Sequence, residues 1–183
     1  MTNIFEGKLV RLRAEEPTDK EPFRRWVEHD TESSRLIYRI PFPESSVQAA
    51  AGEPKAPQGD NFDFVIETLG GEVVGGIDPH DCDPRCGTFM YGIGIFPEHR
   101  RKGYSSEALR LMLGYLFRER RYQKCTVEVF SFNLPSIRLQ ERFGFTLEGR
   151  LRRTIYSEGA YHDSLFFGMT TEEFETIYGG GGH

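Results

Sequence analysis

A basic loop is the first segment whose residue types suggest chemistry. His99-Arg100-Arg101-Lys102 is a dense basic patch in an otherwise acidic chain, and Gly103 follows it directly. The loop separates a strand-like segment, 88–96, from an apolar helical segment that begins at Tyr104. A helix N-terminus offers free N–H groups and a positive dipole end, and glycine lets an anion approach the main chain. This pattern predicts a phosphate site, with a solvated basic turn as the alternative.

A second polar cluster covers residues 78–86 and holds one histidine, two cysteines and three carboxylates. Cys82 and Cys86 form a Cys-x₃-Cys pair that could bind zinc together with His80. No second Cys/His pair stands at finger spacing, and the Asp-Pro dipeptides favour turns. We interpret the segment as a turn and expect no metal, leaving a zinc-stabilised interaction module as an alternative. Because the segment follows a strand, Asp78 or His80 could contact a substrate.

Composition limits the class of protein. The chain has 183 residues, 38% of them hydrophobic and 28% charged, and a net charge of −5. These values fit a single soluble domain, and the acidic balance argues against general nucleic-acid binding. No apolar run is long enough for a membrane span or signal peptide, so we expect a cytoplasmic protein. We expect one domain over 1–178, with 179–183 as a tag remnant or disordered tail, and a monomer or homodimer.

The elements that must position these residues follow from periodicity and turn signals. Thr18-x-x-Glu21 resembles a capping box that opens a helix, and Gly70-Gly71 predicts a tight hairpin. Residues 41–61 are rich in proline and glycine and predict a long loop with a short helix at 45–51. The spacing predicts an α+β domain with strands at 8–13, 62–68, 72–77, 88–96, 125–130, 145–154 and 161–169, and helices at 104–119, 133–143 and from Thr171.

Three segments resemble a known family. Arg100-Arg101-Lys102-Gly103-Tyr104-Ser105 is similar to the Arg/Gln-x-x-Gly-x-Gly/Ala pyrophosphate loop of the GNAT acetyltransferases, and Ser106-Glu107-Ala108-Leu109 extends the likeness. Asn133-Leu134-Pro135-Ser136 through Arg142-Phe143-Gly144-Phe145 resembles the family's Asn-x-x-Ser…Gly-Phe block. Leu147-Glu148-Gly149 and Gly159-x-Tyr161-x-Asp163…Met169 resemble the RimJ/RimL-type branch.

The resemblance implies a fold and a donor. The fold would be a GNAT-like mixed, mostly antiparallel sheet flanked by helices and splayed between the strands at about 88–96 and 124–130. A bulge near Gly92 would help to open it. Acetyl-CoA would be the co-substrate, with its pantetheine lying along 93–96 like an added strand. The residues implied in binding it are Ile95, Phe96, Arg100, Arg101, Lys102, Gly103, Tyr104, Ser105, Ser106, Asn133, Ser136 and Phe143.

The catalytic side chains are less regular. Met90 stands where many members have a glutamate, and Gln140 stands where a tyrosine acid is common. We expect Ser136, Tyr91 and Asp78 to be catalytic, and a base could also act through water from His80 or Glu128. The backbone N–H of Ile95 or Phe96 would bind the thioester carbonyl.

The implied reaction is direct attack of a primary amine on acetyl-CoA in a ternary complex. The amine would be a protein N-terminus or a small amine, and an acidic acceptor side would favour a cationic one. Because the usual glutamate is missing at Met90, the alternative is a non-catalytic acyl-CoA-binding or sensor protein on the same fold.

Overall fold

The computed structural model describes residues 3–29 and 59–180. Most of the loop predicted at 41–61, its short helix, and the last residues of the predicted tail lie outside the described residues.

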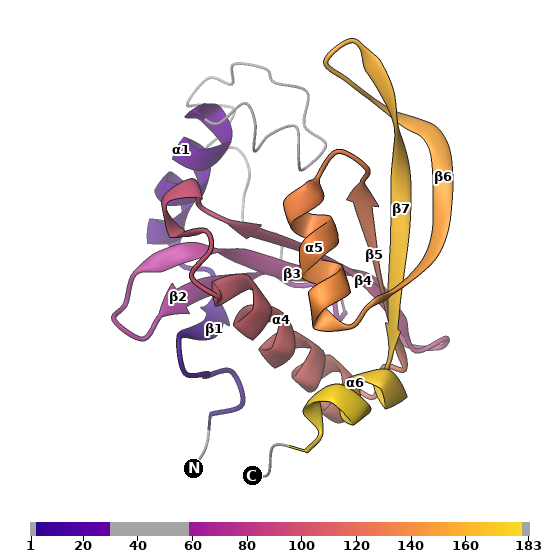
Figure 1. Ribbon diagram of the computed structural model, residues 1–183. Helices are drawn as coiled ribbons and strands as arrows, with labels where there is room; N and C mark the ends of the chain where they lie inside the picture. Colours follow the sequence, from indigo (N-terminus) through magenta and orange to yellow (C-terminus); the bar gives the residue numbers. More distant parts are fainter. Residues whose placement is uncertain (1–2, 30–58, 181–183) are drawn as a thin grey trace.

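A seven-stranded sheet forms the centre of the described structure, in the order β1-β2-β3-β4-β5-β7-β6 (Figure 1). Every neighbouring pair is antiparallel except β4 and β5, which are parallel. The mixed, mostly antiparallel sheet is therefore confirmed. Its strands are β1 Val10–Ala14, β2 Phe64–Thr68, β3 Val73–Asp83, β4 Thr88–Ile95, β5 Lys124–Phe130, β6 Thr146–Ser157 and β7 Ala160–Thr170.

Helices cover the two faces of this sheet. α4, Tyr104–Gly114, and α5, Leu134–Phe143, lie on one face (Figure 1). The apolar residues of α4 belong to the same buried cluster as Phe89 and Leu12. A π-helical turn, Tyr115–Glu119, continues α4 in place of the single long helix predicted. α1, Lys20–His29, lies on the other face, and α6, Thr171–Tyr178, follows β7.

Two glycines place α1 against the sheet. A Cβ at Gly94 would overlap the ring of Trp26, and a Cβ at Gly76 would press on Phe23. Glycine is therefore required for this close approach of helix to sheet. The aromatic side chains of α1 consequently lie directly over β3 and β4, beside the point where the sheet opens.

β4 and β5 separate after a short stretch of pairing. They pair only from Thr88 to Met90, although β4 remains paired with β3 as far as Ile95. The predicted splay is confirmed. The bulge predicted near Gly92 is wrong, because Gly92 pairs regularly with Asp78 and the register shift in this ladder lies between His80 and Asp83. The sheet opens because β4 leaves β5, and the β3–β4 ladder stays intact.

The segment interpreted as a turn is largely strand. β3 continues through Asp78 to Asp83, so only the residues after Asp83 form the turn to β4. Pro79 is tolerated because it faces Tyr91 between the bonded pairs of the β3–β4 ladder, where no N–H is needed. On the other side, β2 pairs with β3 only as far as Ile77. The prediction of a turn from Asp-Pro was therefore wrong at Asp78-Pro79.

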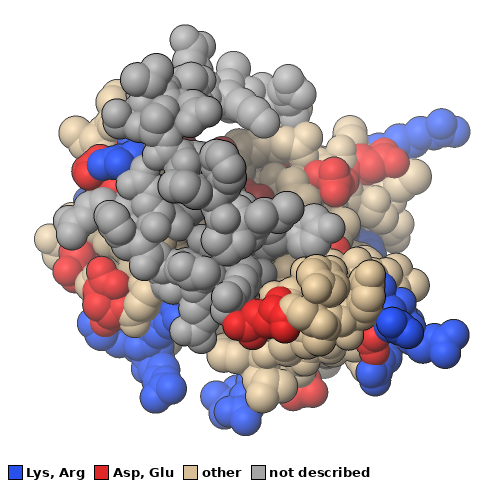
Figure 2. All heavy atoms as spheres, turned by 90° about the horizontal axis from the view of Figure 1, so that it is seen from above, with Lys and Arg blue, Asp and Glu red and all other residues tan. Residues whose placement is uncertain are grey.

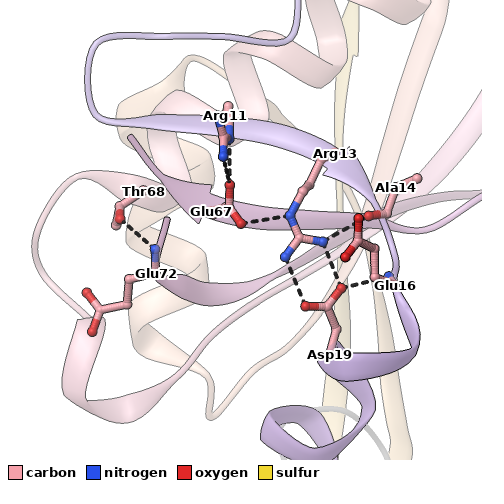
Figure 3. A network of polar contacts seen from close by, with 8 residues as sticks. All are labelled: Arg11, Arg13, Ala14, Glu16, Asp19, Glu67, Thr68 and Glu72. Atoms are coloured by element: carbon pink, nitrogen blue, oxygen red, sulfur yellow. Dashed lines mark hydrogen bonds and ion pairs between the residues drawn. The ribbon is translucent and has the colours of Figure 1, made fainter. Parts of the chain in front are cut away.

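An ion-pair network fixes β1, β2 and the start of α1 (Figure 3). Arg13 donates to Asp19 at 2.7 and 2.9 Å and to Glu67 at 2.8 Å, and Arg11 also binds Glu67. The capping box is formed by Glu16 and Asp19 before a 3₁₀ turn at Pro17–Asp19, so the predicted Thr18–Glu21 box was wrong. The carboxylate of Asp19 accepts hydrogen bonds from both Arg13 and the N–H of Glu16, which fixes it as the capping residue. The sequence spacing alone does not show this contact with Arg13.

Candidate active site

A cavity of about 520 Å³ lies where β4 and β5 separate. Its walls combine both sides of the opening, the start of α1 and one face of α5. The residues that line it include Glu15, Phe23, Trp26, Asp63, Asp78, His80, Met90, Tyr91, Gly92, Glu128, Phe130, Ser136 and Gln140.

Backbone groups of β4 face the opening at alternate residues. The N–H of Phe96 donates to the carbonyl of Val74 at 2.9 Å, so Phe96 is turned toward β3 and cannot supply the predicted thioester donor. Because backbone direction alternates along a strand, the groups of Tyr91, Ile93 and Ile95 face the opening. In agreement, the carbonyl of Ile95 accepts from Arg100 Nε at 3.2 Å on that side. Beyond Met90, β4 thus has no β5 partner in the described structure, and apart from the Ile95 carbonyl its outward ladder groups can bind a ligand.

The basic loop has the geometry of an anion site. Arg101 and Gly103 adopt positive φ angles of 64° and 86°, and Gly103 is the N-cap of α4. These two left-handed residues stand on either side of Lys102, and such a curled main chain forms a concave surface that can bind an anion. The first turn of α4 adds N–H groups that have no partner within the helix. The carboxylate of Glu107 fixes this helix start, because it accepts the N–H groups of residues 8–10 at 2.8, 2.6 and 2.8 Å. The residues present fit a pyrophosphate.

An acid–base pair stands beside the position that lacks the usual glutamate. His80 pairs with Met90 across the β3–β4 ladder, and its Nδ1 lies 2.9 Å from Oδ2 of Asp78. The hydrogen bond to Asp78 raises the pKa of His80, although partial burial opposes the shift. Both side chains line the cavity. The cross-strand neighbour of Met90 can therefore accept a proton there.

Tyr91 and Gln140 form a buried pair in the opposite wall. The Tyr91 hydroxyl donates to Oε1 of Gln140 at 2.6 Å, and the two residues are 3% and 0% exposed. Burial raises the pKa of Tyr91 well above its usual value. Within the described part of the chain, Nε2 of Gln140 has no hydrogen-bond partner. The amide thus brings an unmet donor to the cavity wall.

The N-terminus of α5 is ordered by its own cap. Oδ1 of Asn133 accepts the N–H of Ser136 at 3.1 Å, which places Ser136 at the cavity. The Oδ1 of Asn133 is used by this cap, and its side-chain NH₂ group can still donate to a ligand. Phe143 packs between Phe145 and Tyr178 and is 4% exposed, so the structure places it in the core.

The structure brings together the three residues expected to be catalytic. Ser136, Tyr91 and Asp78 all line the cavity, whereas Ser136 is the one predicted donor-binding residue that does so among those described. The basic loop lies outside the cavity, at the start of α4. From the sequence, His80 was predicted only as a possible base acting through water. Its position beside Met90 depends on the β3–β4 register, which the sequence does not reveal.

Residues 3–29 and 59–180 contain no group of three or more His, Cys, Asp or Glu placed to hold a metal ion. The Sγ of Cys82 instead contacts the carbonyl of Asp60 at 3.3 Å. None of the helices in these ranges has the length and apolar character that a membrane span requires.

Known proteins resemble this chain over most of its length. The family model described as an acetyltransferase (GNAT) domain matches residues 10–146. The SPbeta prophage-derived uncharacterized N-acetyltransferase YokL of Bacillus subtilis (strain 168) is 39% identical over 175 residues, covering 96% of this chain and 97% of YokL. The uncharacterized N-acetyltransferase YnaD of the same organism is 26% identical and covers 83% and 91%.

A solved structure shares the fold. The spermidine N-acetyltransferase of Vibrio cholerae in complex with CoA and spermine superposes with a TM-score of 0.82 at 22% identity, covering 90% of this chain and 97% of that chain. Together, the domain match, the full-length likeness to YokL and the splayed sheet show that this chain belongs to the GNAT family of acetyltransferases.

Proposed function

We propose that this acetyltransferase moves an acetyl group from acetyl-CoA to a primary amine by direct attack in a ternary complex. The observation that carries the proposal is the position of the Asp78–His80 pair beside the opening where β4 parts from β5. The opening can hold an amide-bearing arm, and the pair can accept the proton that the amine must lose.

Donor binding would use the face of the sheet that carries α4. The pyrophosphate would take the N–H groups at the start of α4 and the charges of Arg101 and Lys102. The pantetheine amides would then satisfy the edge groups of Tyr91, Ile93 and Ile95, as an added strand does. The Vibrio cholerae protein, which shares this fold, was solved in complex with CoA, and this supports a CoA thioester as the donor.

The reaction is balanced by named groups. The amine nitrogen bonds to the thioester carbonyl carbon, His80 takes its proton directly or through one water, and the C–S bond then breaks. An N–H of Ile93 or Ile95 would stabilise the developing oxyanion. The Ser136 hydroxyl and the unmet Nε2 donor of Gln140 would stabilise the departing thiolate. Tyr91 orients Gln140 in this scheme, since its hydroxyl is already bonded to that amide.

The C-terminal segment supports a finer placement. We also propose that the chain belongs to the RimJ/RimL-type branch, because the Leu147-Glu148-Gly149 and Gly159-x-Tyr161-x-Asp163…Met169 segments resemble that branch. In the structure these residues belong to the β6–β7 hairpin, in which Asp163 accepts the N–H of Arg153 at 2.8 Å. The motif therefore marks a structural hairpin and does not identify the acceptor.

The test is amine-dependent release of CoA by the full chain and by His80→Gln. Because Cys86 is exposed, CoA is quantified by chromatography and not with a thiol reagent. We expect turnover that requires an amine and falls roughly 100-fold in His80→Gln, with acetyl-CoA affinity unchanged. An undiminished rate in His80→Gln would remove the proposed base. Absence of CoA release with every amine tried would contradict acetyl transfer to amines.

A further inference from the structure

Two carboxylates, Glu15 just after β1 and Asp63 just before β2, continue the sheet register toward Asp78 of β3, on the α1 face of the sheet. Phe64 pairs with Ala14 on one side and with Ile77 on the other. One residue beyond these pairs, the same registers bring Asp63 between Glu15 and Asp78. Side chains at matching positions of neighbouring strands point to the same face. We call Glu15, Asp63 and Asp78 the carboxylate row.

The row ends at the opening in the sheet. Asp78 pairs with Gly92, and a Cβ at Gly92 would lie 2.9 Å from Oδ1 of Asp78. Gly92 has no side chain, so the carboxylate of Asp78 can lie directly over it at the opening. Glu128 of β5 lines the cavity from the far side of the opening.

The same cavity has walls suited to a cation. Its described lining includes the carboxylate row and Glu128 but no Lys or Arg. Partial burial and then repulsion from Asp63 raise the pKa of Glu15, and the positive charge of Lys20 only partly opposes this shift. Phe23, Trp26 and Phe130 add aromatic surface that can cover alkyl carbons or face a positive charge.

An independent feature indicates that the cavity receives a polar ligand. Gln140 is 0% exposed and lines the cavity, yet its Nε2 has no partner among the described residues. A buried donor without a partner is costly unless a ligand or water completes it. The cavity wall therefore combines Gln140, which has an unmet buried donor, with the carboxylate row.

The two faces of the sheet separate donor from acceptor. The basic loop begins α4, which packs on the face of Phe89, whereas Phe23 and Trp26 of α1 cover the opposite face at Gly76 and Gly94. Seen from above, Lys and Arg side chains of the described residues project mainly at the edges, while Asp and Glu also occur toward the middle (Figure 2). An acceptor would enter on the α1 side and meet the thioester at the opening.

We propose that the preferred acceptor is a small aliphatic diamine or polyamine, whose second positive charge binds the carboxylate row. Neighbouring strands are about 4.8 Å apart, so Asp63 and Glu15 stand roughly 5 and 10 Å from the Asp78 position. The second cationic nitrogen therefore lies about 5–10 Å from the reacting nitrogen. This inference rests on the proposed amine acetylation and adds the acceptor's charge and length.

The test compares three series of equal chain length with the full chain and saturating acetyl-CoA. The series are α,ω-diamines, n-alkylamines and ω-aminocarboxylates, with end-to-end spans of roughly 4–12 Å to bracket the expected distance. We expect kcat/KM for diamines to exceed that of alkylamines by at least about tenfold within the 5–10 Å window. Aminocarboxylates should react more slowly than alkylamines. Added salt screens the charges and should reduce the differences in kcat/KM between the three series.

Variants connect this preference to the row. Glu15→Gln and Asp63→Asn should each lower the ratio of diamine to alkylamine kcat/KM, and the double variant should bring the ratio near one. Glu172→Gln, on the exposed face of α6, is the matched control and should keep the wild-type ratio. Equal rates for diamines and alkylamines in wild type, or an unchanged ratio in the double variant, would overturn this inference while leaving amine acetylation intact. Acetyl-CoA binding without acetylation of any series would overturn the proposed function itself.

Discussion

His80 stands directly across the β3–β4 ladder from Met90, with its Nδ1 2.9 Å from Asp78. The sequence lacks a glutamate at the strand position where many relatives are expected to carry one, and the structure supplies a histidine on the neighbouring strand. The two positions share one face of the sheet, so a proton acceptor on either strand reaches the same space.

This relationship predicts a functional exchange between the two positions. His80→Gln should lower kcat roughly 100-fold, and Met90→Glu added to it should recover a measurable part of that loss because it restores a base. Steady-state kinetics with a diamine would measure both steps. Leu147→Glu, at an exposed position on β6, tests whether any added carboxylate has the same effect. Recovery by Leu147→Glu, or none by Met90→Glu, would contradict the shared position of the base.

The pH dependence follows from the direction of the His80 shift. The hydrogen bond to Asp78, joined by the charges of Asp78 and Asp81, raises the pKa of His80 above its usual 6.5. The active base is neutral His80, so kcat should fall as the pH decreases through the raised pKa. Asp78→Asn removes the main cause and should move this limb to lower pH, as a pH–rate profile would show. If the acidic limb of the pH–rate profile stays at the same pH in Asp78→Asn, the group that titrates there is not His80.

The anion site at the start of α4 predicts a specific loss of donor binding. Gly103→Glu introduces a carboxylate at the N-cap, where φ is 86° and a Cβ would meet Leu9 at 3.3 Å. Calorimetry should show that acetyl-CoA affinity falls at least about 100-fold, because the added charge opposes phosphate. Gly159→Glu is the matched control, since Gly159 has φ of 79° in open space at the β6–β7 turn. Equal affinities in the two variants would contradict the loop assignment.

The Tyr91–Gln140 pair predicts effects on both stability and rate. Tyr91→Phe leaves Oε1 of Gln140 buried without its 2.6 Å hydrogen bond, so unfolding free energy should fall by about 1–3 kcal/mol. If Tyr91 orients the amide toward the thiolate, kcat should also fall while the KM for acetyl-CoA changes little. Chemical denaturation and kinetics together separate the two effects. A loss of stability with unchanged kcat would limit Tyr91 to a structural role.

The network in Figure 3 predicts acid sensitivity of the α1 side. Hydrogen bonds from Arg13 lower the pKa of Asp19, which is 2% exposed. Its stabilising contribution is present above its unfolded pKa of about 3.8 and is lost as pH falls through the lower folded value. Asp19→Asn should cost about 3 kcal/mol at neutral pH and remove this part of the acid dependence. Equal pH dependence of unfolding in both proteins would contradict the assignment.

The sequence predicted the elements around the basic loop more fully than the strand pairing around His80. The loop at 100–105, the helix from Tyr104 and the opening between β4 and β5 depend on local signals, namely glycine, charge and strand-to-helix order. Phe96 was an incorrect choice of donor because the direction of its N–H depends on the ladder with Val74.

The acceptor side depends on pairing between distant segments. His80 reaches Met90 only because β3 continues past Pro79, and proline had indicated a turn there. The carboxylate row requires three strands in one register, with Glu15 and Asp78 separated by a long stretch of chain. No local sequence pattern around Glu15 or Asp78 indicates that the two residues lie near each other.

The most direct measurement is mass spectrometry of the products formed from acetyl-CoA and an α,ω-diamine by the purified full chain. The account predicts one acetylated amine for each CoA released, with both products reduced together in His80→Gln. Saturable acetyl-CoA binding with neither free CoA nor acetylated amine above the protein-free control would contradict it.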